Sequence, residues 1–311
     1  MSIKPIIIVP GESKSVFFEI FFKTLKSKSF RSPLLLICNF KEFKNQMKIF
    51  KFKKNYEILD FKILKNKELN NKTIYIIDVN PDNPRMYIHN CFETAFKLIK
   101  SKFSNKFLNG PINKKKSLNK KYLGVTEYIA AKFNKKKIGM LIYNKDLSVS
   151  PITTHLPLKL VAKKISQKLI KEKVVTINSF YKKNFGFKPN IGVTGLNPHC
   201  ESILKINEDD RIIKPAINNL KKKKINIVGP LAADTIFLKQ NRVKYDVILG
   251  MYHDQVLTPV KTLFEYNATN ITMGLPFLRV SPDHGPNEKM FKKNKSNPQS
   301  LINSLNFLDR K

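Results

Sequence analysis

Residues 246–255 read DVILGMYHDQ, a short apolar run that ends in polar and ionisable side chains. The run Asp246–Leu249 has the length and composition of a buried strand, and His253 follows shortly after it. In open α/β sheets, ligands gather outside the carboxyl ends of the strands. The segment therefore predicts an α/β fold with its chemistry at that edge of the sheet.

Similar apolar runs alternate with amphipathic segments along the chain. The expected strands are Ile6–Val9, Leu34–Cys38, Thr73–Asp78, Ile138–Tyr143, Ile191–Thr194, Ile225–Val228 and Asp246–Leu249. The expected helices are Lys14–Ser27, Arg85–Lys102, Leu158–Glu172, Asp209–Lys222 and Gln299–Leu308. Alternation of this kind predicts α/β layers with a mostly parallel sheet. The segment Asn144–Thr153 separates two halves that each hold several strand–helix pairs.

Composition excludes several classes of protein. The 311 residues are 42% apolar and include 23 Phe, which opposes intrinsic disorder. No run approaches the roughly 18 apolar residues of a membrane span, and Pro5–Pro10 is too short for a signal peptide. Three cysteines without CxxC spacing, Cys38, Cys91 and Cys200, fit a reducing compartment. We therefore expect a soluble, cytoplasmic protein.

The chain carries a large excess of positive charge, with 58 Lys and Arg against 23 Asp and Glu, a formal net charge of +35. Only six of these basic residues are Arg, the residue that reads phosphates and guanine edges through its bidentate fork. Short lysine runs at 114–116, 135–137 and 221–224 spread along the chain. This distribution favours a permissive lysine-rich surface, and a polyanionic partner is the alternative.

Histidines supply the strongest candidates for chemistry. His155, His199 and His253 each follow an expected strand, so all three imidazoles can point into one crevice. Three protein ligands with open positions make a catalytic metal site, and imidazole binds zinc, cobalt and nickel. The alternative for each is a hydrogen-bonded histidine without a ligand, which is our interpretation of His89. His284 lies in a fourth unusual context, SPDHG.

Other polar residues suit an anionic substrate. Lys261, Asn270 and Arg279 follow the His253 segment, and Arg279 lies among apolar neighbours. There its guanidinium can hold a phosphate or carboxylate through two hydrogen bonds. Lys114 follows a Gly-Pro turn. The alternative for each lysine is a solvated loop residue.

Seven separated motifs resemble the 4-hydroxythreonine-4-phosphate dehydrogenase family of vitamin B6 biosynthesis. They occur in the family's order and are GPINK (110–114), TEY (126–128), TTHLPLK (153–159), GLNPH (195–199), GPLAADTIF (229–237), MYHDQ (251–255) and NITMGLPFLRVSPDHG (270–285). The resemblance extends over residues from about 5 to 309.

The resemblance implies two α/β/α domains with mostly parallel sheets, similar to isocitrate and isopropylmalate dehydrogenases, with the active site in the interdomain cleft. We expect the first domain at residues 1–145 plus 286–311, and the second, with the metal-ligand histidines, at 146–285. The resemblance further implies a homodimer that shares ligands near its interface.

The family's activity supplies expectations for the site. It oxidises 4-phosphooxy-L-threonine with NAD(P), and the resulting β-keto acid loses carbon dioxide to leave 3-amino-2-oxopropyl phosphate. The resemblance implies a divalent metal, zinc or alternatively magnesium or cobalt, on His155, His199 and His253. The substrate contacts that it implies are Thr126, Lys261, Asn270 and Arg279, with Asp234 and Asp254 as orienting carboxylates and Lys114 and Asp283 as further positions.

Departures from the family pattern motivate alternatives. Val125 stands where the family usually has the His of a His-Thr pair. The loop at residues 11–19 lacks the second and third glycines of the family's loop, and the run after His199 replaces the family's glycine-rich run. An altered contact alters what a pocket accepts, so a sister dehydrogenase for threonate or erythronate 4-phosphate is the alternative. A polyanion-binding protein that has lost catalysis is a further one. Without a glycine fingerprint and its acidic partner, both NAD and NADP stay open.

Overall fold

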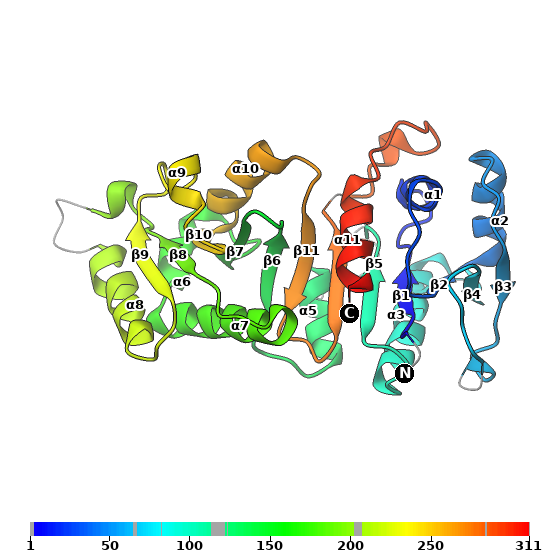
Figure 1. Ribbon diagram of the computed structural model, residues 1–311, viewed down its shortest axis with the longest axis horizontal. Coiled ribbons are helices and arrows are strands. Elements are labelled where there is room, and N and C mark those ends of the chain that lie inside the picture. Colours follow the sequence, from blue (N-terminus) through cyan, green and yellow to red (C-terminus); the bar gives the residue numbers. More distant parts are fainter. Residues whose placement is uncertain are drawn as a thin grey trace. The chain divides into compact units, whose positions relative to one another are not determined.

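The computed structural model describes residues 3–64, 67–81, 83–112, 122, 124–201, 207–283 and 285–310 (Figure 1). Its chain divides into two compact units. Unit 1 consists of Met1–Ile129, Tyr266–Asn270 and Leu275–Lys311, and unit 2 of Ala130–Glu265 and Ile271–Gly274.

These bounds differ from the expected domains in three places, one of which is the short segment Tyr266–Asn270, which belongs to unit 1. Residues 275–285 belong to unit 1 because strand β12 (Leu278–Pro282) pairs in parallel with β5 (Lys106–Asn109). Residues 130–145 belong to unit 2, where β6 (Gly139–Tyr143) pairs antiparallel with β7 (Ser148–Thr153). The segment Asn144–Thr153, which we expected to separate the two halves of the chain, thus contains strand β7.

Unit 1 is built on parallel strands in the order β3-β4-β2-β1-β5-β12. The strands not yet given are β1 (Ile6–Val9), β2 (Leu34–Cys38), β3 (Tyr56–Ile58) and β4 (Ile74–Asp78). Every residue of β1 and β2 is buried. Continuous apolar runs are typical of parallel strands covered on both faces, which explains why the sequence reveals these two strands clearly.

Helices of this unit bury aromatic side chains against one another. They are α1 (Phe17–Ser27), α2 (Phe40–Ile49), α3 (Pro84–Lys100) and α11 (Gln299–Asp309), with the short helix η5 (Glu288–Met290); α5 (Val125–Lys132) begins in this unit. Phe18 and Phe22 of α1 are one turn apart and both contact Phe43 of α2, with ring centroids 5.9 and 5.8 Å from it. Such i, i+4 spacing gives a helix one apolar face.

Unit 2 holds the strand order β6-β7-β10-β8-β9, parallel from β7 to β9. Its further strands are β8 (Ile191–Thr194), β9 (Ile227–Leu231) and β10 (Val247–Tyr252), while β11 (Thr269–Met273) has residues in both units. Its helices are η2 (Leu158–Leu160), α6 (Val161–Lys164), α7 (Gln167–Phe185), η3 (Pro198–Cys200), η4 (Asp209–Ile213), α8 (Lys214–Lys221), α9 (Lys239–Arg242) and α10 (His253–Phe264). The expected mostly parallel α/β architecture is confirmed.

The helix expected at Leu158–Glu172 is interrupted. Ile165 adopts an extended conformation (φ −68°, ψ 132°) and ends α6, and Ser166 begins a new helix. The Ser166 hydroxyl accepts a hydrogen bond from the Leu169 backbone N–H at 3.2 Å. Serine is a strong N-cap because it satisfies an N–H group that has no partner within the helix, and this local signal outweighs the continuous apolar spacing.

Five strands, β3, β5, β7, β11 and β12, lie outside the apolar runs that the sequence analysis selects. β7 reads SVSPIT, and all six of its residues are buried. The Ser150 hydroxyl donates to the Met140 carbonyl at 2.7 Å, and the Thr153 hydroxyl donates to the Met251 carbonyl at 2.8 Å. Partners from distant segments allow polar residues to occupy a buried strand.

Asp309, at the end of α11, accepts hydrogen bonds from the backbone N–H groups of Arg31 at 3.0 Å and Ser32 at 2.7 Å. Burial raises the pKa of Asp309, but these donors and the Arg31 charge outweigh burial, and the pKa lies below its ordinary value. A carboxyl with a lowered native pKa stabilises the fold above its unfolded-state pKa, and this contribution is lost as the pH falls through the native pKa.

We therefore expect Asp309→Asn to lower the free energy of unfolding at pH 7 by about 1 kcal/mol, a modest value because the carboxylate is partly exposed. The difference from wild type should shrink below about pH 4, where the carboxyl begins to protonate in the unfolded chain. Urea unfolding at pH 7 and pH 3 measures it. If Asp309→Asn lowered the free energy of unfolding equally at both pH values, the stabilisation would not come from the ionised Asp309 carboxylate.

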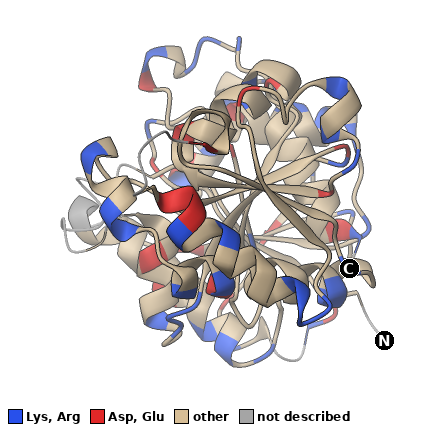
Figure 2. Cartoon of the chain, turned by 90° about the vertical axis from the view of Figure 1, so that its left-hand side faces the viewer, with Lys and Arg blue, Asp and Glu red and all other residues tan. Residues whose placement is uncertain are grey.

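Charge is dispersed in the view of Figure 2, where Lys and Arg occur on many helices and loops and the sheet interior is largely uncharged. Within the described ranges, no helix is both long and apolar enough to cross a membrane.

Candidate metal and substrate site

The three candidate imidazoles follow three neighbouring strands of unit 2. Strand β10 lies between β7 and β8 in the sheet, and Tyr252 is in register with Thr153. His155 lies just beyond β7, His253 directly follows β10, and His199 lies in the loop after β8. Because parallel strands end at the same edge, the topology gathers all three at the carboxyl edge of unit 2.

The structure brings two of these rings close together. The His155 and His253 ring centroids are 6.0 Å apart. Among the described residues, no three His, Cys, Asp or Glu side chains are grouped closely enough to hold one metal ion. His155 and His253 therefore form a close pair, and His199 lies in the loop after β8.

Carboxylates lie beside Nδ1 of two of the imidazoles. His253 Nδ1 is 2.6 Å from Asp254 Oδ1, and His199 Nδ1 is 3.8 Å from Asp234 Oδ2. A carboxylate at one ring nitrogen favours the tautomer that leaves the other nitrogen as the ligand atom, as is usual for metal-binding histidines. Asp254 is within hydrogen-bond distance of its imidazole, whereas Asp234 is only within ion-pair distance of His199. Both residues are those expected as orienting carboxylates.

His155 and His199 also share an unusual backbone conformation. Their φ angles are 51° and 55°, in the left-handed region. This region is uncommon for residues other than glycine and costs free energy, and such residues concentrate at functional sites. The chain therefore maintains both imidazoles in positions that an unconstrained loop would disfavour.

The loop that carries His199 is attached to a buried carboxylate. Asp209 is fully buried and accepts hydrogen bonds from the backbone N–H groups of Leu196 at 2.9 Å and Asn197 at 3.0 Å. The Asn197 side chain donates to the same carboxylate at 2.8 Å. Sequence reasoning missed Asp209, although an acidic residue at the start of a helix is a signal for such an anchor.

Gln255 is a second residue that sequence reasoning missed. Its Oε1 accepts hydrogen bonds from the Thr194 hydroxyl at 2.8 Å and the Met251 N–H at 2.7 Å. Its Nε2 donates to the Gly195 carbonyl at 2.8 Å. The only sequence signal was its place in MYHDQ, two residues after His253.

The donor set of unit 2 fits a divalent transition metal. Imidazole nitrogens suit Zn, Co and Ni, and a carboxylate at the opposite ring nitrogen raises their basicity. His155 and His253 already lie near each other, and His253 and His199 each have such a carboxylate. These observations support a metal role for the histidines and do not distinguish one ion from another.

Arg279 lies in unit 1, on β12, and only 2% of its surface is exposed. Its Nε donates to Asn109 Oδ1 at 2.8 Å, and its Nη1 donates to the Thr126 hydroxyl at 3.5 Å. Burial lowers the pKa of Arg279 to about 10, opposed by the Glu127 charge. The guanidinium therefore remains charged at neutral pH, and the structure brings it together with Thr126, another expected substrate contact.

Several buried acceptors in the described part of this unit have no hydrogen-bond partner, among them Glu127 Oε2 and Asn270 Oδ1. Buried polar atoms in proteins are nearly always paired, and an orphan calls for a missing donor. Asn270 was an expected substrate contact, whereas Glu127 was not singled out from the motif TEY. A ligand that donates a hydrogen bond would satisfy such acceptors.

The remaining expected positions have varied surroundings. Lys261 is half-buried on α10, two turns after His253. The Asp283 backbone N–H donates to the Ser300 hydroxyl at 2.7 Å. His89 lies 3.1 Å from the Tyr128 hydroxyl, which agrees with a hydrogen-bonded structural histidine. Lys114 and His284 lie outside the described residues.

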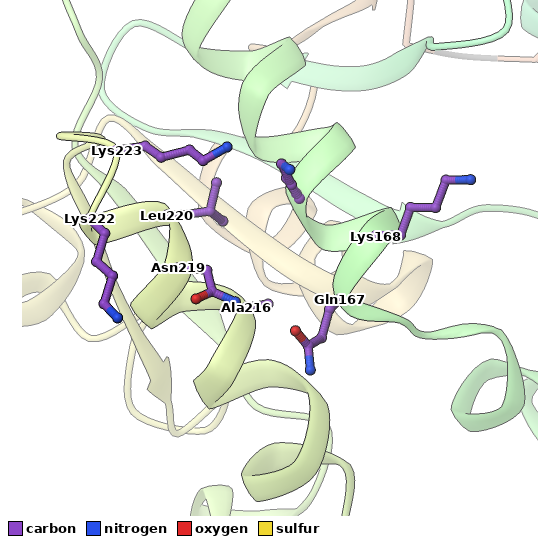
Figure 3. Close-up of a pocket in the computed structure, with 8 residues that line it drawn as sticks. Gln167, Lys168, Ala216, Asn219, Leu220, Lys222 and Lys223 are labelled. Carbon is purple, nitrogen blue, oxygen red and sulfur yellow. The ribbon is translucent and has the colours of Figure 1, made fainter.

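A pocket of about 490 Å³ lies between α7 and α8 and is separate from these residues. Gln167 and Asn219 present carboxamides from the two helices, and Lys168 and Lys222 point away from the gap (Figure 3). Lys223 also lines it and precedes the first residue of β9 by four positions. The pocket thus adjoins the side of unit 2 where β9 begins, whereas the imidazoles lie where strands end.

Comparison with known proteins identifies the relatives of this chain. A family model described as PdxA, pyridoxal phosphate biosynthetic protein, matches residues 26–308. The 4-hydroxythreonine-4-phosphate dehydrogenase of Sulfurihydrogenibium sp. (strain YO3AOP1) is 41% identical over 68% of this chain and 67% of its own length. The 4-hydroxythreonine-4-phosphate dehydrogenase of Wigglesworthia glossinidia brevipalpis is 34% identical over 91% of this chain and 89% of the relative's length. Other curated relatives align over shorter segments, down to 49% of their length.

The solved structures agree with the sequence comparison. The 4-hydroxythreonine-4-phosphate dehydrogenase of Klebsiella pneumoniae has a TM-score of 0.85 and 27% identity, over 99% of this chain and 97% of that chain. The resemblance that the motifs indicated is confirmed. The chain belongs to the PdxA family of pyridoxal phosphate biosynthetic proteins, the family of the 4-hydroxythreonine-4-phosphate dehydrogenases.

Proposed function

We propose that this chain oxidises 4-phosphooxy-L-threonine with NAD(P) in a reaction that depends on a divalent metal held by His155, His199 and His253. The observation that carries the proposal is the set of imidazoles after three neighbouring strands, two of them beside carboxylates at Nδ1. A dehydrogenase that used nicotinamide alone would not need this set.

The reaction balances without another reactant. The substrate carbon gives a hydride to NAD(P)⁺ and its hydroxyl releases a proton, which leaves 2-amino-3-oxo-4-phosphobutanoate. Loss of the carboxylate as carbon dioxide and uptake of a proton give 3-amino-2-oxopropyl phosphate. When bound, the divalent ion supplies Lewis acidity that lowers the pKa of a substrate hydroxyl and polarises a ketone.

The protein's own residues have distinct tasks in this proposal. Asp254 and Asp234 orient His253 and His199 so that Nε2 is the ligand atom. Arg279 remains cationic and pairs with the phosphate or carboxylate of the substrate, with Lys261 as a second cation. Asn270 Oδ1 accepts a hydrogen bond from a substrate ammonium or hydroxyl group, which supplies the partner that it lacks.

We also propose a homodimer, in line with the shared ligands that the family resemblance implies. Analytical ultracentrifugation of the purified protein tests this directly. A sedimenting mass near twice the 36.0 kDa of one chain is the expected result, and a mass of one chain at micromolar concentration would contradict it.

The central experiment measures metal content and turnover in one preparation. We expect bound divalent metal by elemental analysis, and reduction of NAD or NADP when 4-phosphooxy-L-threonine is added. Chelation should abolish turnover, and zinc, cobalt or magnesium should restore it. Bound metal without turnover of this substrate with either dinucleotide would overturn the assignment.

Val125 motivates a second substrate for comparison. It is the first residue of α5, directly before Thr126, where the family usually carries an imidazole. We expect 4-phosphooxy-L-threonine to be turned over faster than threonate or erythronate 4-phosphate. The reverse order would assign the chain to the sister activity.

A further inference from the structure

A chain of hydrogen bonds joins the ends of the three strands that precede the histidines. At the end of β7, the Thr153 hydroxyl donates to the Met251 carbonyl at 2.8 Å, and the Met251 N–H on β10 donates to Gln255 Oε1 at 2.7 Å. Gln255 then contacts the end of β8 through the Thr194 hydroxyl at 2.8 Å and the Gly195 carbonyl at 2.8 Å. We call Thr153, Thr194 and Gln255 the strand-end network.

Each member of the strand-end network lies close in sequence to one imidazole. Thr153 is two residues before His155, and Gln255 is two residues after His253. Thr194 ends β8, and the loop with His199 follows it. The network therefore connects the backbone at the base of all three loops.

Burial makes these hydrogen bonds strong constraints. Thr194 is 0% exposed and Thr153 is 5% exposed, so water competes poorly for their hydroxyls. Gln255 Oε1 accepts two hydrogen bonds and Nε2 donates one. Loss of this carboxamide would leave several buried groups unpaired at once, which costs more than the loss of one exposed bond.

We infer that Thr153, Thr194 and Gln255 are positioning residues that fix the spacing of His155, His199 and His253 for one divalent ion. The inference rests on the proposed metal role of these histidines. None of the three network residues is proposed as a ligand: Thr153 and Gln255 bond to backbone groups of neighbouring segments, and Thr194 bonds to the Gln255 side chain. Ligand sets need positions held within about 0.5 Å, and short loops alone rarely provide this.

The test compares isosteric variants with a matched control. Gln255→Met removes all three hydrogen bonds of the Gln255 carboxamide, and Thr194→Val removes only the one that the Thr194 hydroxyl donates. Thr176→Val is the control, because it likewise removes a threonine hydroxyl hydrogen bond, the one donated to the Glu172 carbonyl at 2.7 Å, but on α7 and away from the network. Thr194→Ser keeps the hydroxyl and serves as the rescue variant.

Co²⁺ affinity, measured by competition with a chelating dye, is the first measurement. We expect Gln255→Met to weaken Co²⁺ binding about 10- to 100-fold, the usual effect of losing a group that supports metal ligands. Thr176→Val and Thr194→Ser should stay within about twofold of wild type. The double variant Gln255→Met/Thr194→Val should bind about as weakly as Gln255→Met alone, because both changes remove bonds to one carboxamide.

Amide hydrogen exchange of the metal-free protein is the second measurement. We expect Gln255→Met to exchange faster than wild type at residues 195–199 and 251–253, with the exchange of α7 unchanged. Wild-type Co²⁺ affinity and exchange in Gln255→Met would overturn the inference, as would an equal loss of affinity in Thr176→Val. A wild-type protein that binds no Co²⁺ and oxidises no substrate would instead refute the proposed function, while hydrogen exchange would still report on the network.

Discussion

His253→Ala is expected to remove metal and activity together and to leave a folded protein. His253 is only partly buried and begins α10, so the loss of its ring creates little cavity. It is the imidazole with the closest carboxylate, 2.6 Å away, and the one that approaches His155. Lewis-acid assistance is worth several kcal/mol, so turnover should fall by about 10³-fold or more.

Elemental analysis and steady-state NAD(P) reduction measure this result, with circular dichroism to verify folding. His89→Ala is the matched control, because His89 lies on α3 in unit 1 and contacts the Tyr128 hydroxyl. The control should retain full metal content. A His253→Ala protein with wild-type metal content would refute the proposed ligand set.

Arg279→Lys is expected to raise KM for the phosphorylated substrate strongly, with a smaller change in kcat. Lysine keeps the charge but loses the planar fork and the Nε bond to Asn109 at 2.8 Å. Hydrogen bonds to charged groups contribute about 1.5–3 kcal/mol, which corresponds to about 10- to 150-fold in KM. Because burial lowers the pKa of Arg279 only to about 10, wild-type binding should not decline through this residue between pH 6 and 8.

The matched control is Arg242→Lys, since Arg242 also uses its guanidinium in a hydrogen bond, to the Phe237 carbonyl at 2.9 Å in unit 2. That variant should keep KM within about twofold. Initial rates over a range of substrate concentrations separate KM from kcat. An unchanged KM in Arg279→Lys would mean that Arg279 contributes to packing within unit 1 and not to substrate binding.

The proposed metal ligands and the residues that position them differ in how far the sequence alone could indicate them. The contexts of His199 and His253 are local, because each follows a strand that a short apolar run reveals, and His155 lies in the motif TTHLPLK although its strand β7 was not expected. Asp209 begins a helix and Gln255 lies in the motif MYHDQ, but neither pattern reveals what the side chain binds. Their roles depend on carbonyl, hydroxyl and N–H groups that reach them from other strands and loops.

The sequence by itself determined the α/β class, the strands with continuous apolar residues, the family and the candidate histidines. A strand buried on both faces must be apolar unless its polar groups find partners, so β1, β2 and β10 were visible without any structure. The spacing of motifs also carried the resemblance, since it depends only on the order of residues in the chain.

Only the tertiary structure decided which polar residues lie inside and what they hold in place. β5, β7 and β12 contain buried Lys, Ser, Thr and Arg side chains, and the partners of Lys106, Thr153 and Arg279 are far away in the sequence. The Thr194–Gln255, Thr153–Met251 and Arg279–Asn109 hydrogen bonds join residues separated by 61, 98 and 170 positions. Local spacing contains no information on such pairs, because they form only when the sheet brings distant strand ends together and excludes water from their polar groups.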